Sequence, residues 1–261
     1  MRLCRVEVGG SARWARIDGD LVRAYSAAPW DRPAELGGAM PMEGAVLLPP
    51  CEPSKVVCVG LNYRAHAAEM GKELPAEPLI FLKAPSSLLP PGGQVILPPD
   101  SVQVEHEGEL ALVIGRTARD VAPAHALDHV LGYACLDDVT ARDVQRREKV
   151  YGRAKGYDTF CPVGPWLETE IADPQGLDVE LRVNGEVRQR GSTADMIFPV
   201  AEVIAFVSRI MTLLPGDLIS TGTPPGVGRL TAGDRVEVEI PAIGVLAHTV
   251  AAPHRPPAEV G

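Results

Sequence analysis

The sequence predicts a mixed, β-rich α+β fold, and three observations support this prediction. Glycine and proline number 26 and 25 among 261 residues, which favours many turns and short strands over long helices. Short apolar runs rich in β-forming residues recur along the chain, whereas residues 200–213 place apolar side chains at helical spacing. The length allows one large domain, or a large domain with a small companion.

Composition and charge narrow the class of protein. Hydrophobic residues make up 46% and charged residues 23%, which is ordinary for a soluble globular protein. The net charge is −9 without a long basic run, which argues against nucleic acid or an anionic membrane surface as the main partner. We find no secretory signal and no apolar stretch long enough to span a membrane. The five cysteines form no CxxC pair, so we expect reduced thiols and a cytoplasmic protein.

The first 50 residues predict a small β-rich region. Residues 3–8, 12–17 and 21–26 read as strands of an antiparallel meander, with turns at Gly9-Gly10 and residues 18–20. Residues 27–42 form a connection with room for one short helix, and Pro49-Pro50 marks a boundary. This piece is too short to hold much core, so we expect it to lean on the rest of the chain.

A large second region, residues 51–252, follows. Residues 55–60 predict a buried strand, and residues 62–71 a short helix with Asn62 near its start and Gly71 at its end. Residues 79–83 predict another strand and residues 85–99 a loop.

The remaining elements are predicted from local patterns. They are a strand at 104–115, helices opening near 124 and 140, a polar surface segment at 146–158, a hairpin at 177–190 around Asn184-Gly185, the helix at 200–213, strands at 217–221, 235–240 and 245–250, and a loose tail at 253–261.

The strand at 104–115 carries the most informative pattern in the chain. Glu105, Glu107 and Glu109 occupy every second position, so in a strand their side chains share one face. Like charges beside a buried strand are unfavourable unless a cation neutralises them. Oxygen ligands suit Mg²⁺, Mn²⁺ or Ca²⁺ better than zinc. The alternative is a solvated strand end that binds no ion.

Four segments together resemble the fumarylacetoacetate hydrolase family. They are GLNYRAHAAEMG at 60–71, HEGELALVIG at 106–115, GYACLDDVTARDVQ at 132–145 and STGTPPGVG at 220–228. The resemblance covers about residues 51–250 and implies the β-roll of the family's C-terminal catalytic domain, preceded here by the small N-terminal region. The most similar subgroups are acylpyruvate hydrolases and 2-hydroxyhepta-2,4-diene-1,7-dioate isomerases.

The resemblance implies a metal site made of Glu107, Glu109 and Asp138, with Mg²⁺ or Mn²⁺ as the ion and Ca²⁺ as a further possibility. Glu105 would lie one step further out on the same face. Asp137 would point the other way. Pleat geometry places His106 on the opposite face, as a packed or surface residue rather than a ligand.

Three residues are implied to act in catalysis. His66 and Glu69 resemble a water-activating pair on a lid, in which Glu69 orients the imidazole and His66 takes the proton. The alternative is an exposed pair on a surface helix, since such i,i+3 pairs are common. Lys155 matches a lysine that stabilises the substrate oxyanion. The alternative is a solvated lysine in a polar loop.

Three further residues are implied to bind substrate. Lys83 lines the pocket or else caps a strand end, Gln145 holds a water, and Thr223 offers a hydroxyl and an amide to a carboxylate. The loop around Thr223 could instead be an ordinary Gly-Pro turn. Arg142 and Asp143 are interpreted as a structural ion pair.

These residues imply an enzyme that acts on a small 2-oxo or 2-hydroxydienoic acid through a stabilised enolate. Isomerisation, decarboxylation and acylpyruvate hydrolysis in aromatic catabolism all remain open, as does decarboxylation of oxaloacetate. A calcium-stabilised binding module is a second hypothesis. A zinc hydrolase is a third, disfavoured because no HExxH motif is present. The family resemblance also implies a homodimer.

Overall fold

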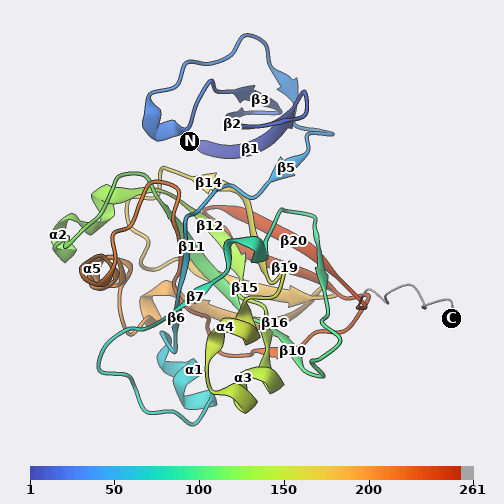
Figure 1. Cartoon of the computed structure of the whole chain (residues 1–261), viewed down its shortest axis with the longest axis vertical. Helices are drawn as coiled ribbons and strands as arrows, with labels where there is room; N and C mark the ends of the chain where they lie inside the picture. The colour runs from blue at the N-terminus through green and yellow to red at the C-terminus, as the bar shows by residue number, and fades with distance from the viewer. Residues whose placement is uncertain (254–261) are drawn as a thin grey trace, which may run out of the picture.

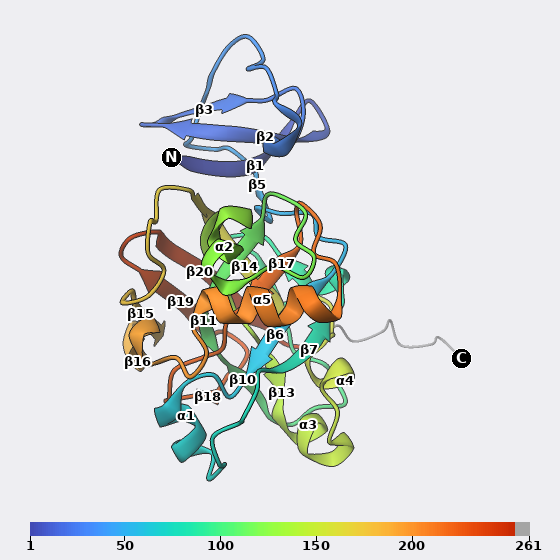
Figure 2. The same cartoon turned by 90° about the vertical axis from the view of Figure 1, so that its left-hand side faces the viewer.

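The computed structural model describes residues 1–253, so residues 254–261 of the expected loose tail lie outside it. The N-terminal strands lie at one end of the molecule, while α1 (Arg64–Glu69), α3 (Arg142–Glu148) and α4 (Tyr151–Lys155) gather at the other (Figures 1 and 2). The predicted β-rich α+β class is confirmed. No helix among residues 1–253 is long and apolar enough to cross a membrane.

The largest sheet runs through both regions of the chain. Its strand order is β4-β3-β2-β1-β14-β12-β11-β17-β6-β7, with β5 on β1 and β8 on β14. The strands are β1 (Arg2–Val8), β2 (Ser11–Asp18), β3 (Leu21–Ala24), β4 (Met40–Pro41), β5 (Leu47–Leu48), β6 (Val56–Gly60), β7 (Leu79–Lys83), β8 (Leu88–Leu89), β11 (Gly108–Ile114), β12 (Val130–Asp137), β14 (Cys161–Glu168) and β17 (Leu218–Ser220).

Two smaller sheets complete the fold. One has the order β16-β15-β19-β20-β9 and the other the order β13-β10-β18. Their strands are β9 (Gln94–Ile96), β10 (Val104–His106), β13 (Thr140–Ala141), β15 (Asp178–Val183), β16 (Glu186–Ser192), β18 (Gly228–Arg229), β19 (Arg235–Ile240) and β20 (Gly244–Ala251). The hairpin predicted at Asn184-Gly185 is confirmed by β15 and β16. The loop predicted at 85–99 is wrong in part, because β8 and β9 lie within it.

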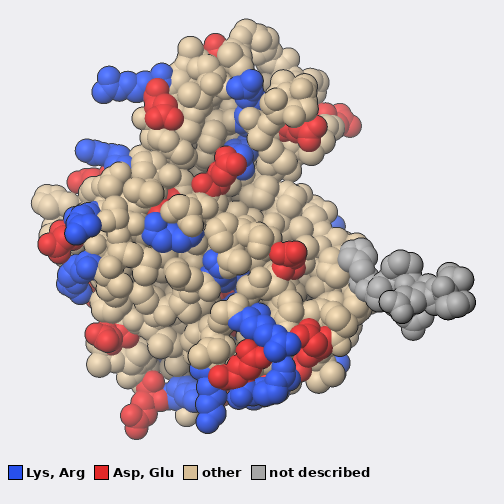
Figure 3. All heavy atoms as spheres, viewed as in Figure 1, with Lys and Arg blue, Asp and Glu red and all other residues tan. Residues whose placement is uncertain are grey.

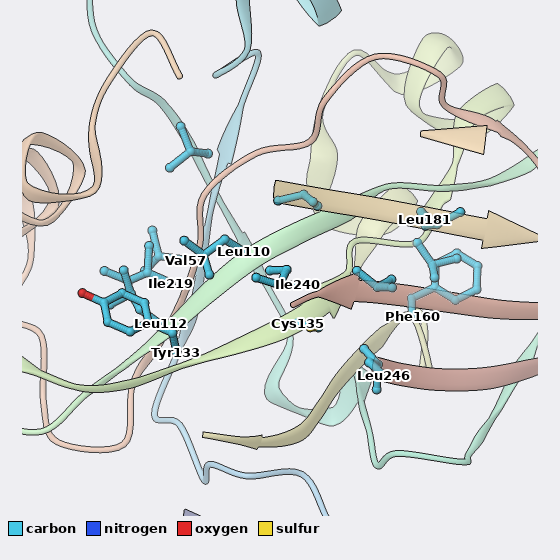
Figure 4. Packing of buried hydrophobic residues seen from close by; sticks show 14 of the residues in the cluster. Val57, Leu110, Leu112, Tyr133, Cys135, Phe160, Leu181, Ile219, Ile240 and Leu246 are labelled. Atoms are coloured by element: carbon cyan, nitrogen blue, oxygen red, sulfur yellow. The ribbon is translucent and has the colours of Figure 1, made fainter. Parts of the chain in front are cut away.

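The main core lies between the large sheet and the five-stranded sheet. Leu110 and Leu112 of β11 pack toward Leu181, Ile240 and Leu246 of β15, β19 and β20 (Figure 4). The intervening residues of β11 face a second apolar cluster, so this strand is buried on both sides. A strand buried on both faces reads as a continuous apolar run, as residues 110–114 do.

Helices are few and short. Beside α1, α3 and α4 they are α2 (Pro123–Ala126), α5 (Val200–Ile210) and the 3₁₀ turns η1 (Pro29–Asp31), η2 (Pro85–Ser87), η3 (Leu127–His129) and η4 (Thr193–Asp195). The amphipathic helix predicted at 200–213 is confirmed: α5 lies across the sheet in Figure 2 and buries Val203, Ile204 and Val207 in the main core. The polar segment 146–158 was expected at the surface, but it contains α4 and the buried Lys155.

The N-terminal meander is present as predicted, with register from Arg2↔Ile17 to Val8↔Ser11 between β1 and β2. It leans on the second region, because Arg2 and Leu3 of β1 pair with Glu168 and Leu167 of β14. Its own core holds only Cys4, Val6, Ala15 and Val22 as fully buried apolar residues among those described.

The strand predicted at 104–115 is broken. β10 belongs to the three-stranded sheet and β11 to the large sheet, and Glu107 lies between them. The N–H of Glu107 donates to Asp137 Oδ1 at 2.7 Å, and the N–H of Gly108 donates to Gln189 Oε1 at 2.9 Å. The side chains of Asp137 and Gln189 therefore accept the backbone hydrogen bonds that a neighbouring strand would accept in a regular β-ladder.

Candidate metal and active site

Three buried carboxylates converge at the break between β10 and β11. One oxygen each from Glu107, Glu109 and Asp138 lies within 4.8 Å of the others, and the residues are 5%, 2% and 1% exposed. The N–H of Asp138 donates to the Glu107 carbonyl at 2.8 Å, which ties the two segments together. The structure thus brings together the ligand set that the family resemblance implies.

Asp137 supports this arrangement from behind. Its carboxylate accepts the Glu107 N–H and also lies 2.8 Å from Nε2 of His248, which is fully buried. Asp137 therefore faces away from the three carboxylates, as expected, and holds the backbone of one of them. His106 is also buried and lies 3.0 Å from Gln189 Oε1, in agreement with the prediction that it is packed.

Basic side chains surround the carboxylates. Lys155 Nζ donates to Glu107 at 2.6 Å and to Asp138 at 2.5 Å, and Lys83 Nζ donates to Asp138 at 2.5 Å. Arg142 donates to Glu105 at 2.6 Å and also to Glu107. With Glu105 included, four acidic and three basic side chains are buried together here among residues 1–253, so the acidic groups outnumber the basic ones by one.

Glu109 is the acidic side chain of this group that accepts no hydrogen bond from Lys83, Arg142 or Lys155. Burial raises the pKa of Glu109 well above its usual range, and the neighbouring Asp138 and Glu107 charges raise it further. Within residues 1–253 its Oε2 accepts hydrogen bonds only from neutral groups, the Ser220 hydroxyl and, at 2.7 Å, the Gly222 N–H. Burial also opposes ionisation of Glu107, but the charges of Lys155 and Arg142 hold its pKa below the usual range.

These residues fit a hard divalent cation. Three oxygen donors of net negative charge, one of them lacking a cationic partner, favour Mg²⁺, Mn²⁺ or Ca²⁺. No histidine or cysteine joins the cluster among residues 1–253, which disfavours zinc.

The carboxylates open into a cavity of about 520 Å³. Its walls come from the loop after β6, from α1, α3 and α4, and from the loop after β17. The lining residues include Leu61, His66, Lys72, Phe81, Glu107, Glu109, Asp138, Arg142, Gln145, Arg146, Lys149, Tyr151, Lys155 and Thr223.

His66 and Glu69 meet on α1. His66 Nδ1 lies 3.0 Å from Glu69 Oε2, and His66 is only 5% exposed although it lines the cavity. Glu69 Oε1 accepts the Gly226 N–H at 2.9 Å, which joins α1 to the loop beyond Thr223. The pair therefore belongs to the cavity wall rather than to a solvated helix face.

Asn62 lies near the start of α1, as predicted, but it does not cap the helix, because Tyr63 occupies that position without a side-chain bond. Instead the Asn62 amide donates to the carbonyls of Thr221 and Phe198, at 2.8 and 3.1 Å, and accepts the Phe198 N–H. It thereby holds the start of α1 against the loop after β17.

Thr223 lines the cavity, but its hydroxyl is already used. The hydroxyl donates to the Gly108 carbonyl at 2.9 Å and accepts from Gln189 Nε2 at 2.7 Å. The Thr223 N–H has no acceptor among the described residues. Of the two groups expected to bind a carboxylate, the hydroxyl is thus held by protein groups, and the N–H has no protein partner in the described part of the chain.

Three other expectations change in detail. Lys83 does not line the cavity but lies behind Asp138. Gln145 lines the cavity and accepts from Arg142 Nη1 at 2.6 Å. Arg142 and Asp143 are not paired with each other, because Arg142 binds Glu105 and Glu107 while Asp143 accepts from Ser101 and the Val102 N–H.

Gln189 is the main site residue that the sequence reasoning missed. It is 1% exposed, and its amide contacts four groups: the Gly108 N–H, His106, the Thr223 hydroxyl and the Pro224 carbonyl. It lies in β16 between arginines, so the local sequence resembles a solvated strand. An uncharged polar residue between two arginines was the available signal.

Comparisons with known proteins identify the family. The profile described as "Fumarylacetoacetate (FAA) hydrolase C-terminal" matches residues 55–251, and one described as "Rv2993c-like, N-terminal" matches residues 1–50. The chain is 42% identical to an oxaloacetate tautomerase, YisK, of Bacillus subtilis, over 93% of this chain and 87% of that protein.

Two solved structures show the same fold. A 2-hydroxyhepta-2,4-diene-1,7-dioate isomerase from Mycobacterium marinum is 42% identical with a TM-score of 0.90, covering 98% of this chain and 100% of that one. A maleylpyruvate hydrolase from Sphingobium sp. SYK-6, in complex with manganese(II) and pyruvate, is 34% identical with a TM-score of 0.80, covering 97% and 100%.

Proposed function

The chain belongs to the fumarylacetoacetate hydrolase family, and on that premise we propose that it is a divalent-metal-dependent enzyme acting on a small 2-oxo acid through its enolate. The observation that carries this proposal is the buried triad of Glu107, Glu109 and Asp138, which lines the same cavity as His66. The solved structure of a relative with manganese and pyruvate supports both the ion class and the substrate class.

Each group in the cavity has a place in this chemistry. Mg²⁺ or Mn²⁺, held by the triad, would supply a Lewis acid for the carboxylate and 2-oxo oxygens of the substrate. Lys155 adds a buried positive charge that stabilises negative charge developing on the 2-oxo oxygen. The Thr223 N–H is free to donate to the substrate carboxylate.

The first reaction we propose is hydrolysis of an acylpyruvate. His66, oriented by Glu69, takes a proton from a water whose oxygen attacks the distal carbonyl carbon. The carbon–carbon bond next to that carbonyl then breaks, and its electron pair moves toward the 2-oxo group as the enolate of pyruvate. Proton return to the enolate carbon releases pyruvate and a carboxylic acid.

Isomerisation or tautomerisation is the second candidate, favoured by the higher identity to the isomerase than to the hydrolase. It uses the same enolate, but His66 would move a carbon-bound proton instead of activating water. Decarboxylation, including that of oxaloacetate, starts from the same class of substrate and stays a further option.

The test is product analysis with full-length, Mg²⁺-loaded protein. Acetylpyruvate that yields pyruvate and acetate supports hydrolysis, 2-hydroxyhepta-2,4-diene-1,7-dioate that changes isomer without cleavage supports isomerisation, and CO₂ from oxaloacetate supports decarboxylation. Activity must disappear with EDTA and return with Mg²⁺ or Mn²⁺. Inactivity of the metal-loaded protein on all three substrates would contradict the proposal and favour a calcium-stabilised binding module.

We also propose a homodimer. The supporting feature is the edge strand β7 at the end of the large sheet, where Leu79 and Leu82 are 37% and 47% exposed. Light scattering should give twice the mass of one chain, and a monomer at micromolar concentration would contradict this.

A further inference from the structure

The cavity wall formed by α3 and α4 is rich in basic residues. Residues 142–155 hold six lysines and arginines and two acidic residues, in a chain whose net charge is −9. Figure 3 shows basic side chains gathered over α3 and α4, with a few acidic side chains among them. The positive charge is thus concentrated in the two helices that form one wall of the cavity.

The basic residues of the cavity fall into two sets. Arg142 and Lys155, with Lys83 behind them, are buried and bind the acidic residues of the site. Lys72, Arg146 and Lys149 line the cavity but are exposed, and none of them forms a salt bridge within residues 1–253, although Arg146 donates a hydrogen bond to Gln103 Oε1. We call these three residues the cationic mouth.

Lys149 is held in a costly conformation. It ends α3 with φ of 59°, the left-handed region that glycine adopts without strain, and its N–H donates to the Gln145 carbonyl. Leu61, which also lines the cavity, shares this feature with φ of 54°. Two residues of the cavity lining thus hold left-handed backbone conformations, which are frequent at functional sites.

Two aromatic side chains line the same cavity as the cationic mouth and the carboxylates. Phe81 and Tyr151 both line the cavity, with ring centroids 4.9 Å apart in an edge-on arrangement, and Lys155 Nζ lies 5.0 Å from the Phe81 ring. One cavity therefore holds the acidic triad, an aromatic pair and three exposed cationic side chains.

We propose that the cationic mouth binds the far carboxylate of a dicarboxylic 2-oxo acid, so that Lys72, Arg146 and Lys149 select diacids over monoacids. This inference rests on the proposed function, because the 2-oxo end must be held at the triad. The alternative is that these side chains are solvated like most surface lysines and arginines.

Calorimetric titration of the full-length, Mg²⁺-loaded protein tests the inference. The probes are 2-oxohexanoate and 2-oxohexanedioate, which have the same number of carbons and differ only in the far carboxylate. We expect the wild-type protein to bind the diacid about tenfold more tightly at low salt, and added NaCl to reduce this preference. In the double variant Arg146→Gln/Lys149→Gln the preference should fall below about twofold.

A matched control separates a local contact from a general effect of charge. Arg116 and Arg119 are exposed and lie outside the cavity, so Arg116→Gln/Arg119→Gln removes the same charge while keeping the preference. If the wild type binds both acids equally, or the mouth variant keeps the preference, the inference is overturned and the proposed function stands. If neither acid binds to the loaded wild type, both are contradicted.

Discussion

The N-terminal meander and the carboxylate site both place charged residues on or beside β-strands, and they use them in opposite ways. In the meander Arg16 binds Glu35 and Asp18 at the surface, where all three side chains are at least 30% exposed. At the site, four acidic and three basic side chains are buried together. Surface pairs contribute little to stability, whereas each buried ion loses several kcal/mol of hydration that its partners must offset.

The difference indicates that the site is less stable than an apolar core of the same size would be. A fold that needed only stability would fill the space around β11 with apolar side chains, as it does from Leu110 to Ile114. Keeping three like charges within reach of one another is useful only if a cation or a substrate completes the site. Substitutions of charged residues in the two regions should therefore change the stability of the metal-free protein by amounts that differ in sign as well as in size.

Glu109→Gln should have the largest effect on activity and the most informative effect on stability. Loss of a metal ligand should lower kcat/KM about a thousandfold or more. Because burial and like charges raise the pKa of Glu109, a neutral amide should leave the metal-free protein as stable as the wild type or more stable. Mg²⁺ should raise the Tm of the wild type but not that of the variant.

Thermal unfolding with and without Mg²⁺ measures this directly. A large drop in the Tm of the metal-free variant would mean that Glu109 holds the fold together, and the contrast between the two regions would fail.

His66→Ala should have the second largest effect on activity. Removal of a general base lowers the rate about a hundredfold to ten-thousandfold. Because His66 contacts Glu69 and not the triad, the Mg²⁺-dependent rise in Tm should persist. Steady-state kinetics and Mg²⁺ titration on the same preparation separate this variant from Glu109→Gln. Unchanged hydrolysis in His66→Ala would remove the water-activating role from the dyad.

Gln189→Met tests a residue that supports the site without lining the cavity. The substitution leaves the buried Gly108 N–H without its acceptor, which should destabilise the fold by about 1–3 kcal/mol. Thr223 also loses its link to β16, so KM for a 2-oxo acid should rise about tenfold, by more than kcat falls.

Val187→Met is the matched control, since Val187 lies two residues away in β16 and is 46% exposed. A lower Tm with unchanged KM in Gln189→Met would assign Gln189 a role in folding only.

Local patterns were enough to predict much of the fold. The meander, the hairpin at Asn184-Gly185 and the helix at 200–213 follow from turn residues and hydrophobic periodicity, which the structure keeps. These elements have simple environments, with one face buried and the other exposed, so spacing along the sequence determines their placement.

The site was predictable only in part. Alternating glutamates and the family motifs led to the acidic triad, but the break at Glu107 depends on Asp137 and Gln189, which come from other elements. Lys155 lies in a polar segment that suggests a surface loop, and only the tertiary fold buries it. Contacts between segments distant in sequence leave no local periodicity to detect.

Arg16→Gln should have the smallest effect and completes the contrast. Arg16 loses its bonds to Glu35 and Asp18, but both acids keep contact with water, and the backbone pairing with Leu3 and Arg23 is unaffected. The Tm should change by less than about 3 °C, and kcat/KM and the Mg²⁺ response should stay at wild-type values. A loss of activity comparable to that of Gln189→Met would show that the meander is coupled to the cavity through β1 and β14, so that the two regions are not energetically separate.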